Sequence, residues 1–291
     1  MMFGLVAQTF INGITIGAMY GLIAVGLSLT FGVMKILNVA HGEFLMIGGY
    51  IAFWLFTRYD IDPLLGLPLV AIALFLFGAV FYKILFSGLV KFHEEIKMKN
   101  TLLVAFGLSL IFPQVARWLW TADERGITPF YSGGSFPILG VRIGYVPLAG
   151  LIVAVVVILA LHLLLTKTYF GKSVRATSEN YKAAKLVGIN VNRTYLVTFS
   201  LGAALAGLAG VLVVMTQAVV PDMGMAWTIK ALIVVVLAGI GSVGGAFFAG
   251  ILLGVIESVS AIFMGPYTVA LGMGIFLLIL MFRPQGLFGK A

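Results

Sequence analysis

Residues 171–190 read GKSVRATSENYKAAKLVGIN, and this is almost the only long polar interval in a very apolar chain. Apolar runs at 143–166 and 194–221 flank it. Each run is long enough to cross a bilayer, which takes about 20 apolar residues. A short charged helix between two spanning helices commonly offers a contact surface to a soluble protein. We therefore interpret residues 171–190 as a segment that receives force from a partner and passes it to the membrane helices.

The polar interval predicts a short helix that begins near Ser178. Ser178 suits the N-cap position, and Glu179 then lies in the first turn, where negative charge is favourable. Lys182 and Lys185 follow toward the other end, and Gly188 falls where a left-handed C-terminal residue is expected. A simple cytoplasmic connector that obeys the positive-inside rule would carry similar charges, so both interpretations stay open on these features alone.

The pair Ala183–Ala184, followed after three residues by Gly188, resembles the EAA loop of bacterial ABC importer permeases, which docks into a groove on the ATPase subunit. The side chains of the two alanines are small, so another protein could approach the backbone of this helix closely. Lys182 stands where the general motif carries Glu, which is a departure from the pattern.

The wider sequence is similar to one family in particular, the permeases of high-affinity branched-chain amino acid transporters. The similarity extends from about residue 10 to residue 287. It rests on GKSVRA at 171–176 and GINV at 188–191, and on NVAHGEF at 38–44, AGIGSVGGA at 238–246 and RPQGL at 283–287. The Ala-Ala-x3-Gly pattern alone is common, whereas these motifs in this order are specific.

This resemblance implies an all-α, polytopic membrane protein with the ABC importer permease fold, in which residues 1–291 form one transmembrane permease domain. Residues at about 168–192 would be the cytoplasmic ATPase-coupling loop, in which the coupling residues are Ser178, Glu179, Lys182, Ala183, Ala184 and Gly188. The family works in the bacterial cytoplasmic (inner) membrane by alternating access. Its cargo is a hydrophobic, branched-chain amino acid, although close relatives carry urea or short amides.

The resemblance also implies partners: two cytoplasmic ATP-binding subunits, a second related permease that forms a heterodimer, and a periplasmic or extracytoplasmic substrate-binding protein. The chain itself has no P-loop, so ATP and Mg²⁺ would bind to the partner subunits and no cofactor is expected here. We expect a transport subunit rather than an enzyme, because no catalytic set is visible.

Composition agrees with a protein of the lipid bilayer. The chain is 62% hydrophobic and 10% charged, whereas soluble domains carry about a quarter charged residues. It has no cysteine and three scattered histidines, so we expect no metal site. The net charge of +8 is explained by basic membrane loops better than by nucleic acid.

Clean apolar spans are predicted at 3–34, 64–82, 101–116, 143–166 and 194–221. In the first span glycines recur at 13, 17 and 21, and small residues recur at 202, 206 and 210 in the last one. Such stripes predict close helix contacts. The first stripe allows two interpretations, packing inside the chain or contact with a second subunit.

The second membrane segment is unusual because its apolar run, 44–57, is too short to cross alone. Either its start is buried at depth or the helix is broken there, and irregular backbone at depth is tolerated only next to protein or water. Asn38, His41 and Glu43 are therefore candidates for the lining of a translocation path. The alternative is an ordinary helix cap near the cytoplasmic face.

The runs 231–256 and 258–282 are interrupted only by Glu257, and a glycine-rich break at 239–245 precedes further small residues. We predict eight or nine crossings in all, with Gly241 and Ser242 of the break on the path. Glu257 is either functional or part of an interhelical pair. An ion-coupled secondary transporter that uses Glu43 and Glu257, one per half, is the alternative class.

Loop charges predict the orientation of the chain. The loops at 83–99 and 167–193, the C-terminus and Lys35 together hold most of the 18 basic residues, which places them in the cytoplasm. The other side would hold Arg58, Arg117, Arg125, Arg142 and Lys230. Counting crossings back from the cytoplasmic loops places the N-terminus outside.

Overall fold

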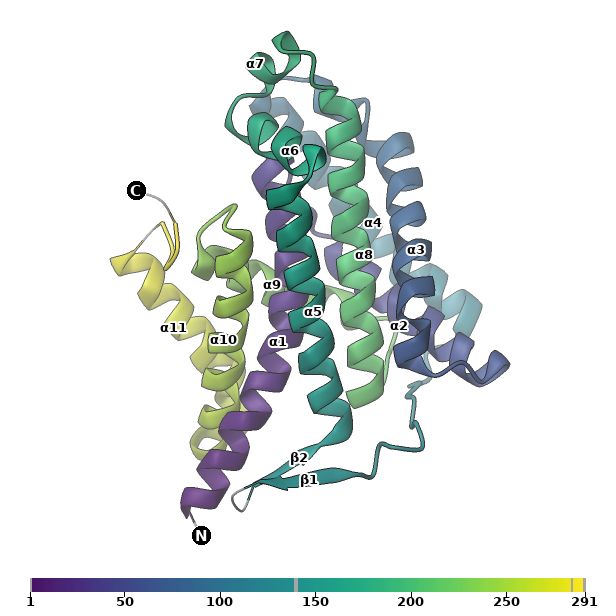
Figure 1. Ribbon diagram of the computed structural model, residues 1–291, viewed down its shortest axis with the longest axis vertical. Helices are drawn as coiled ribbons and strands as arrows, with labels where there is room; N and C mark the ends of the chain where they lie inside the picture. Colours follow the sequence, from purple (N-terminus) through teal and green to yellow (C-terminus); the bar gives the residue numbers. More distant parts are fainter. Residues whose placement is uncertain (1, 139–140, 284, 290–291) are drawn as a thin grey trace.

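The computed structural model describes residues 2–138, 141–283 and 285–289, and it is helical almost throughout (Figure 1). Its helices in chain order are α1 (Met2–Met34), α2 (His41–Tyr59), α3 (Pro63–Phe81), α4 (Glu94–Trp120), α5 (Tyr145–Lys167), α6 (Tyr169–Glu179), α7 (Tyr181–Leu186), α8 (Val191–Thr216), α9 (Met223–Ala238), α10 (Val243–Met264) and α11 (Thr268–Phe282). The predicted helical class is confirmed.

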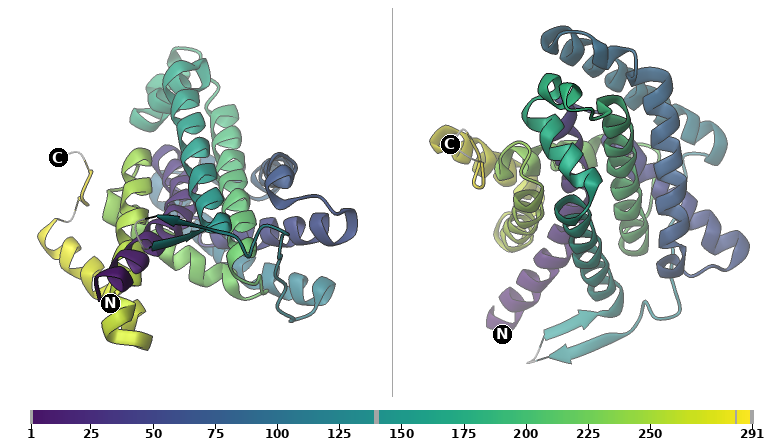
Figure 2. Two further views of the ribbon diagram at one scale, coloured as in Figure 1. Left: turned by 60° about the horizontal axis from the view of Figure 1, so that its bottom comes forward. Right: turned by 45° about the horizontal axis from the view of Figure 1, so that its top comes forward.

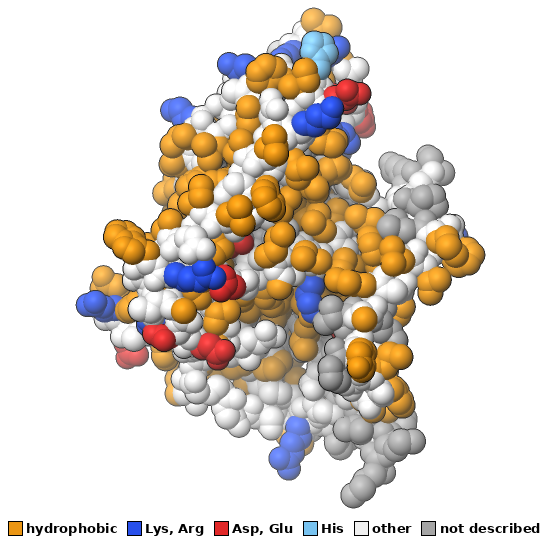
Figure 3. Space-filling model, turned by 180° about the vertical axis from the view of Figure 1, so that it is seen from behind, with side chains coloured by type: hydrophobic (Ala, Val, Ile, Leu, Met, Phe, Trp, Pro, Cys, Tyr) orange, Lys and Arg blue, Asp and Glu red, His pale blue; other side chains and the backbone are white. Residues whose placement is uncertain are grey.

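Six helices in the described part of the chain are long and apolar enough to span a membrane: Val6–Met34, Pro63–Phe86, Glu94–Trp120, Tyr145–Lys167, Val191–Thr216 and Val243–Met264. Each predicted clean span overlaps one of them. Apolar side chains cover much of the face shown in Figure 3, and lysine and arginine side chains gather at the end where α7 lies. This surface is the one expected of a multi-pass membrane protein.

Two helices form the centre of the fold. Nearly all of α1 and α8 is buried, whereas α3, α4, α5 and α10 bury one face and leave the other apolar face exposed. In Figure 2 the C-terminal part of α1 lies among the other helices, whereas its N-terminal part projects beyond them. The layout follows from sequence, because α1 and α8 carry the glycine and alanine stripes that let neighbouring backbones approach closely.

The glycine stripe of α1 packs inside the chain, against α10. A Cβ added at Gly17 would lie 2.6 Å from the Cα of Ile251, and one added at Gly254 would overlap the backbone of Gly17. The two helices therefore run in direct backbone contact along the residues at 13, 17 and 21. The structure thus favours internal packing over a subunit contact for this stripe.

The stripe of α8 packs against α1 and α2. A Cβ at Gly202 would lie 2.6 Å from Oγ1 of Thr30 in α1, and a Cβ at Gly210 would overlap the carbonyl of Leu45 in α2. The close contact predicted for this stripe is confirmed.

The predicted break before the second membrane segment is confirmed. Helix α1 ends at Met34, Lys35 adopts a left-handed φ of 54°, and residues 35–40 turn back alongside α1 without helical structure. A ring nitrogen of His41 lies 3.1 Å from the carbonyl of Ile23, well inside α1. Helix α2 therefore begins partway along α1, and we use the term half-helix for a helix that begins at this depth, whatever its length.

A second half-helix, α9, begins where α2 begins. The backbone N–H of Gly42 donates to Oγ1 of Thr228 at 2.8 Å, and a Cβ at Gly42 would overlap the carbonyl of Gly224. The sequence did not predict α9 as a separate short helix, because its apolar residues continue those on either side. The first turns of the two half-helices are thus in backbone contact.

A small β-hairpin interrupts the helical pattern at the end opposite α7 (Figure 1). Strands β1 (Ser135–Ile138) and β2 (Val141–Gly144) pair antiparallel, with Ser135 opposite Gly144. The side chain of Gln8 donates to the carbonyl of Arg142 at 2.7 Å and accepts from its N–H at 2.8 Å. These hydrogen bonds hold the hairpin against the N-terminal part of α1.

Candidate functional site

The polar residues at 168–192, which we call the coupling segment, form two short helices, α6 and α7, and not one helix that begins at Ser178. Ser178 lies in the last turn of α6, where its hydroxyl donates to the carbonyl of Arg175 at 2.8 Å. Asn180 is the N-cap of α7, since its side-chain oxygen accepts from the N–H groups of Lys182 and Ala183, both at 3.0 Å. The N-cap expected at Ser178 was therefore wrong, because the hydroxyl bonds backward and the amide side chain takes the cap.

The predicted C-terminal glycine of the segment is confirmed. Gly188 has a φ of 84°, which a side chain would strain, and the N–H of Ile189 returns to the carbonyl of Ala184 at 3.0 Å. The resulting turn leaves Leu186 and Val187 89% and 76% exposed. Two adjacent apolar side chains thus lie at the tip of a segment that is otherwise polar.

The two alanines have different environments. Ala183 is exposed, whereas Ala184 is 2% exposed and belongs to the core. The expectation that both alanines form a low contact surface is therefore wrong for Ala184, because its methyl group faces the protein. Glu179 and Lys182 are exposed, and they border a cavity of about 260 Å³ together with Lys35 at the end of α1.

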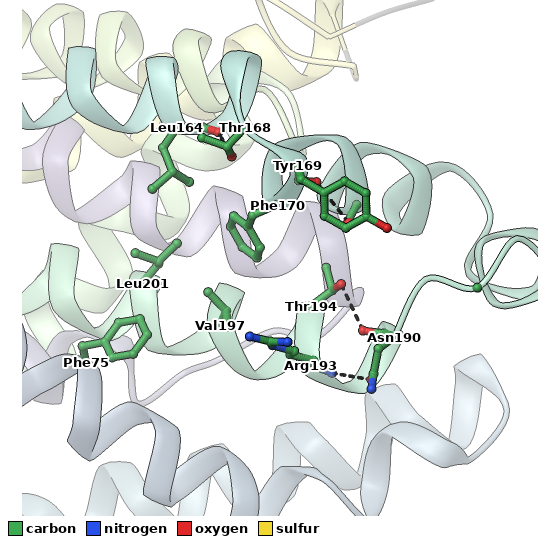
Figure 4. Close-up of a pocket in the computed structure, with 12 residues that line it drawn as sticks. Phe75, Leu164, Thr168, Tyr169, Phe170, Asn190, Arg193, Thr194, Val197 and Leu201 are labelled. Carbon is green, nitrogen blue, oxygen red and sulfur yellow. Dashed lines mark hydrogen bonds between the residues drawn. The ribbon is translucent and has the colours of Figure 1, made fainter.

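A larger groove, about 660 Å³, lies against the coupling segment between α3, α5, α6 and α8 (Figure 4). Phe75, Leu164 and Leu201 line its apolar part, and Arg193 lies at its polar end. There Asn190 caps α8 by accepting from the N–H of Arg193 at 3.0 Å. The groove ends at the start of α8. Displacement of α6 and α7 would therefore move the start of this central helix.

The three candidates before and in α2 are all buried, but they differ in their partners. Asn38 accepts from the N–H of Ala40 at 3.2 Å, and His41 is bonded to Ile23. Glu43 is 0% exposed, and neither of its carboxylate oxygens has a hydrogen-bond partner among the described residues. Asn38 and His41 thus have local structural partners, and Glu43 has none.

Glu43 borders a cavity of about 210 Å³ between α2, α4 and α9. Ser109, Pro113 and Gln114 of α4 line its opposite wall. Asp222, which precedes α9, is also at this cavity and is held in an ion pair by Arg117. The cavity therefore joins both half-helices to a full-length helix.

Glu257 belongs to an interhelical pair. Its Oε2 lies 2.7 Å from Nζ of Lys230 and accepts from the hydroxyl of Tyr20 at 2.8 Å, which links α10, α9 and α1. The prediction of a paired carboxylate is confirmed. Lys230 lies inside α9 and not in an outer loop, so its assignment to the outer group of loop charges was wrong.

Gly241 and Ser242 lie at the α7 end of the molecule, in the connection between α9 and α10. Gly241 has a φ of 85°, and Ser242 caps α10 by accepting from the N–H of Gly245 at 3.2 Å. They border a hollow of about 540 Å³ that also touches Arg175 and Ser178 of α6. These two residues thus neighbour the coupling segment, and Glu43 and Glu257 occupy other positions.

Residues 9–282 match the family described as "Branched-chain amino acid transport system / permease component". The chain belongs to this family. It is 34% identical to the high-affinity branched-chain amino acid transport system permease protein BraD of Pseudomonas aeruginosa, and 29% identical to LivH of Escherichia coli K12, a permease protein of the same description. Each alignment covers 97% of this chain and 95% of the relative. No solved structure matches the chain.

As a member of this permease family, the chain is a transport subunit of an ABC system rather than an enzyme. ATP hydrolysis in such a system takes place on separate subunits. Among the described residues no group of three or more metal-binding side chains comes together. Family membership favours a subunit of an ABC system over an ion-coupled carrier. Glu43 and Glu257 are also not equivalent, since Glu257 is paired and Glu43 is not paired with any described residue.

The sequence analysis missed several residues of this permease that bear on the site. Thr228 joins the two half-helices, Lys230 neutralises Glu257, and Arg117 holds Asp222. One signal was available: Pro221–Asp222 before an apolar run is typical of a helix start. The pairing of residues more than 100 positions apart had no signal in a single sequence.

Proposed function

We propose that this permease is the membrane-spanning subunit of an ATP-driven importer that moves branched-chain amino acids across the bacterial inner membrane by alternating access. The observation that carries the proposal is the full-length similarity to BraD and LivH, proteins named for high-affinity branched-chain amino acid transport. Urea and short amides remain the second cargo class, and direct uptake assays separate the two.

The proposed orientation places the α7 end in the cytoplasm and the hairpin end outside. Lysines of the 83–99 loop lie with α6 and α7, which agrees with the positive-inside rule. Nine passes result if 35–59 and 217–238 each count as one crossing composed of a half-helix and irregular backbone. The N-terminus is then outside and the C-terminus inside.

The coupling role is proposed for α6 and α7. Ala183, Leu186 and Val187 are exposed at the tip of the molecule, and apolar side chains without cover mark interaction sites. We propose that they enter a groove on an ATP-binding subunit. Glu179 and Lys182 then lie at the polar rim of the contact. Gly188 and Ala184 shape the turn that exposes the apolar side chains to the ATP-binding subunit.

The translocation path is proposed to pass the cavity at Glu43, where the two half-helices meet. Half-helices whose ends face a site partway through the membrane are typical of transporter binding sites. Asn38 and His41 hold the irregular entry to α2. Gly241 and Ser242 are proposed to open the path at the cytoplasmic end, and the pair of Glu257 holds α9 against α10.

The remaining partners are proposed from family membership: two ATP-binding subunits that hold ATP and Mg²⁺, a second related permease, and an external substrate-binding protein. Phe130 is 96% exposed and Trp118 is 84% exposed at the hairpin end. An aromatic pair at this end suits either a membrane interface or a docked protein.

The test is purification of the chain from its native membrane, followed by reconstitution into liposomes. Two ATP-binding subunits and a second permease should co-purify, and uptake of leucine should require ATP and the binding protein. Uptake that is driven by an ion gradient without ATP would overturn the proposal. Uptake of urea in place of leucine would keep the mechanism and replace the cargo.

A further inference from the structure

Glu43 is the buried charged group in the described structure that its surroundings explain least. It is fully buried, and both carboxylate oxygens lack a hydrogen-bond partner among the described residues. A buried carboxylate without partners is costly, and an ionisable residue inside the membrane indicates function by default. A group that donates hydrogen bonds would supply the missing partners of this carboxylate.

The first turns of two helices meet at Glu43. It lies in the first turn of α2, and a Cβ at Gly224 in the first turn of α9 would overlap its carboxylate. Neither N-cap, Ala40 of α2 or Asp222 of α9, makes a side-chain cap hydrogen bond. At the start of α2 the N–H groups of His41, Gly42 and Glu43 already donate to Asn38, Thr228 and Ala40. The start of α9 is therefore the helix end at which an anionic group of a ligand is favoured.

The opposite wall supplies further hydrogen-bond acceptors. Pro113 lies inside α4 and has no N–H, so the carbonyl of Ser109, four residues earlier, loses its usual helical donor. Ser109, Pro113 and Gln114 all line the cavity. Phe106, Leu110 and Met225 provide apolar walls beside them. One carboxylate, further acceptors and an apolar surface thus share a single small space.

We propose that the Glu43 cavity binds the ammonium group of a zwitterionic amino acid on its way through the permease, while the N-terminus of α9 faces its carboxylate. A primary ammonium has three donors, and the carboxylate with its neighbouring acceptors matches them. The nearby Asp222 is already held by Arg117, which leaves Glu43 as the free anion of the cavity in the described residues. This inference rests on the proposed function and names the group that the path recognises.

An inorganic cation fits this space less well. Hard cations such as Ca²⁺ and Mg²⁺ take six or more oxygen ligands in a regular shell. No cluster of three metal-binding side chains exists among the described residues. An ammonium group attached to an aliphatic side chain uses both the acceptors and the apolar walls.

The experiment measures binding of radiolabelled leucine to the assembled transporter in lipid nanodiscs, without the binding protein. Two competitors divide leucine into its parts: isopentylamine keeps the ammonium group and 4-methylpentanoate keeps the carboxylate. We expect isopentylamine to compete and 4-methylpentanoate to compete at least tenfold less well.

Glu43→Gln should weaken leucine binding at least tenfold, and Glu43→Asp should weaken it less. The matched control Glu95→Gln, at an exposed carboxylate, should bind as the unaltered protein does.

The outcomes separate the two proposals. Equal competition by the two half-molecules, or unchanged binding in Glu43→Gln, overturns the ammonium site even where ATP-driven leucine uptake is normal. Displacement of leucine by Na⁺ or K⁺ alone, lost in Glu43→Gln, overturns it in favour of an inorganic cation. Failure of the unaltered complex to take up any amino acid overturns the proposed function. The competitor comparison uses unaltered protein, so it decides the question even where Glu43→Gln does not fold.

Discussion

Lys230 and Glu257 show how a single ion pair can be required by the packing around it. The pair links α9 and α10, its side chains are 24% and 14% exposed, and the hydroxyl of Tyr20 completes it from α1. The ring of Tyr20 also lies 4.4 Å from the ammonium nitrogen of Lys230. Removal of one partner leaves the other charge partly buried without compensation.

We therefore expect Lys230→Met and Glu257→Gln each to destabilise the purified protein by about 2 kcal/mol, below the 3–5 kcal/mol typical of fully buried pairs because this one is partly exposed. The double variant should lose less than the sum of the two single losses, since it leaves no lone charge. Thermal unfolding in detergent measures the three variants. Simple additivity of the two losses would mean that the groups do not interact.

Single residues also show what one sequence can predict. The left-handed Gly188 and the paired Glu257 were predictable, because a glycine after a helix and a lone carboxylate in an apolar run each have few stable solutions. Serine and asparagine are both good N-cap residues, so the sequence offered Ser178 and Asn180 as alternatives and Ser178 was chosen. In the structure Asn180 is the N-cap of α7. The burial of Ala184 depends on which way a six-residue helix faces, which sequence does not specify.

Among the elements, α1 and α10 depend on glycine for their contact. A side chain at Gly17 would enter the backbone of α10, since its Cβ would lie 2.6 Å from the Cα of Ile251. Gly107 in α4 is the matched control, because a Cβ there meets nothing within 4 Å. The two positions separate the packing role of glycine from its low helix propensity.

Gly17→Val should abolish the monodisperse protein, since both helices are rigid at the contact and the overlap is with backbone atoms. Gly107→Ala should fold normally, and it should gain up to about 1 kcal/mol, because alanine favours helix over glycine by that amount. Size-exclusion profiles of fluorescently tagged protein and thermal unfolding provide the measurement. Normal folding of Gly17→Val would show that α1 and α10 are farther apart than described.

The half-helices show where element prediction from sequence ends. The break before α2 was predictable, because the apolar run at 44–57 is too short to cross and a polar motif precedes it. The start of α9 had one local signal, Pro221–Asp222, but nothing in the sequence predicted that residues 217–222 before it form no helix, since apolar sequence surrounds them. A distant part of the chain holds the backbone of residues 217–222 in place, since Val219 pairs with Arg125 in the loop after α4. Such long-range pairing has no local pattern.

At the scale of the whole molecule, the chain has two chemically different ends joined by an apolar body. The α7 end carries the coupling segment and most of the lysines, and the hairpin end carries exposed aromatic side chains (Figures 1 and 3). The helical class and the position of the polar segment were predictable from composition and run length. The meeting of α2 and α9 at Glu43 was not, because it depends on how apolar segments far apart in the chain pack.

The last prediction tests the proposed contact between the coupling segment and an ATP-binding subunit. Leu186→Glu with Val187→Glu should reduce co-purification of the ATP-binding subunits by more than tenfold, since buried apolar anchors at interfaces contribute about 2 kcal/mol or more each. The purified permease itself should unfold at an unchanged temperature, because both side chains are exposed. Leu186→Ile, which keeps the apolar surface, is the control and should retain both co-purification and uptake. Loss of uptake with undiminished co-purification would place the docking surface elsewhere on the α7 end and leave the tip with a role in transmitting motion only.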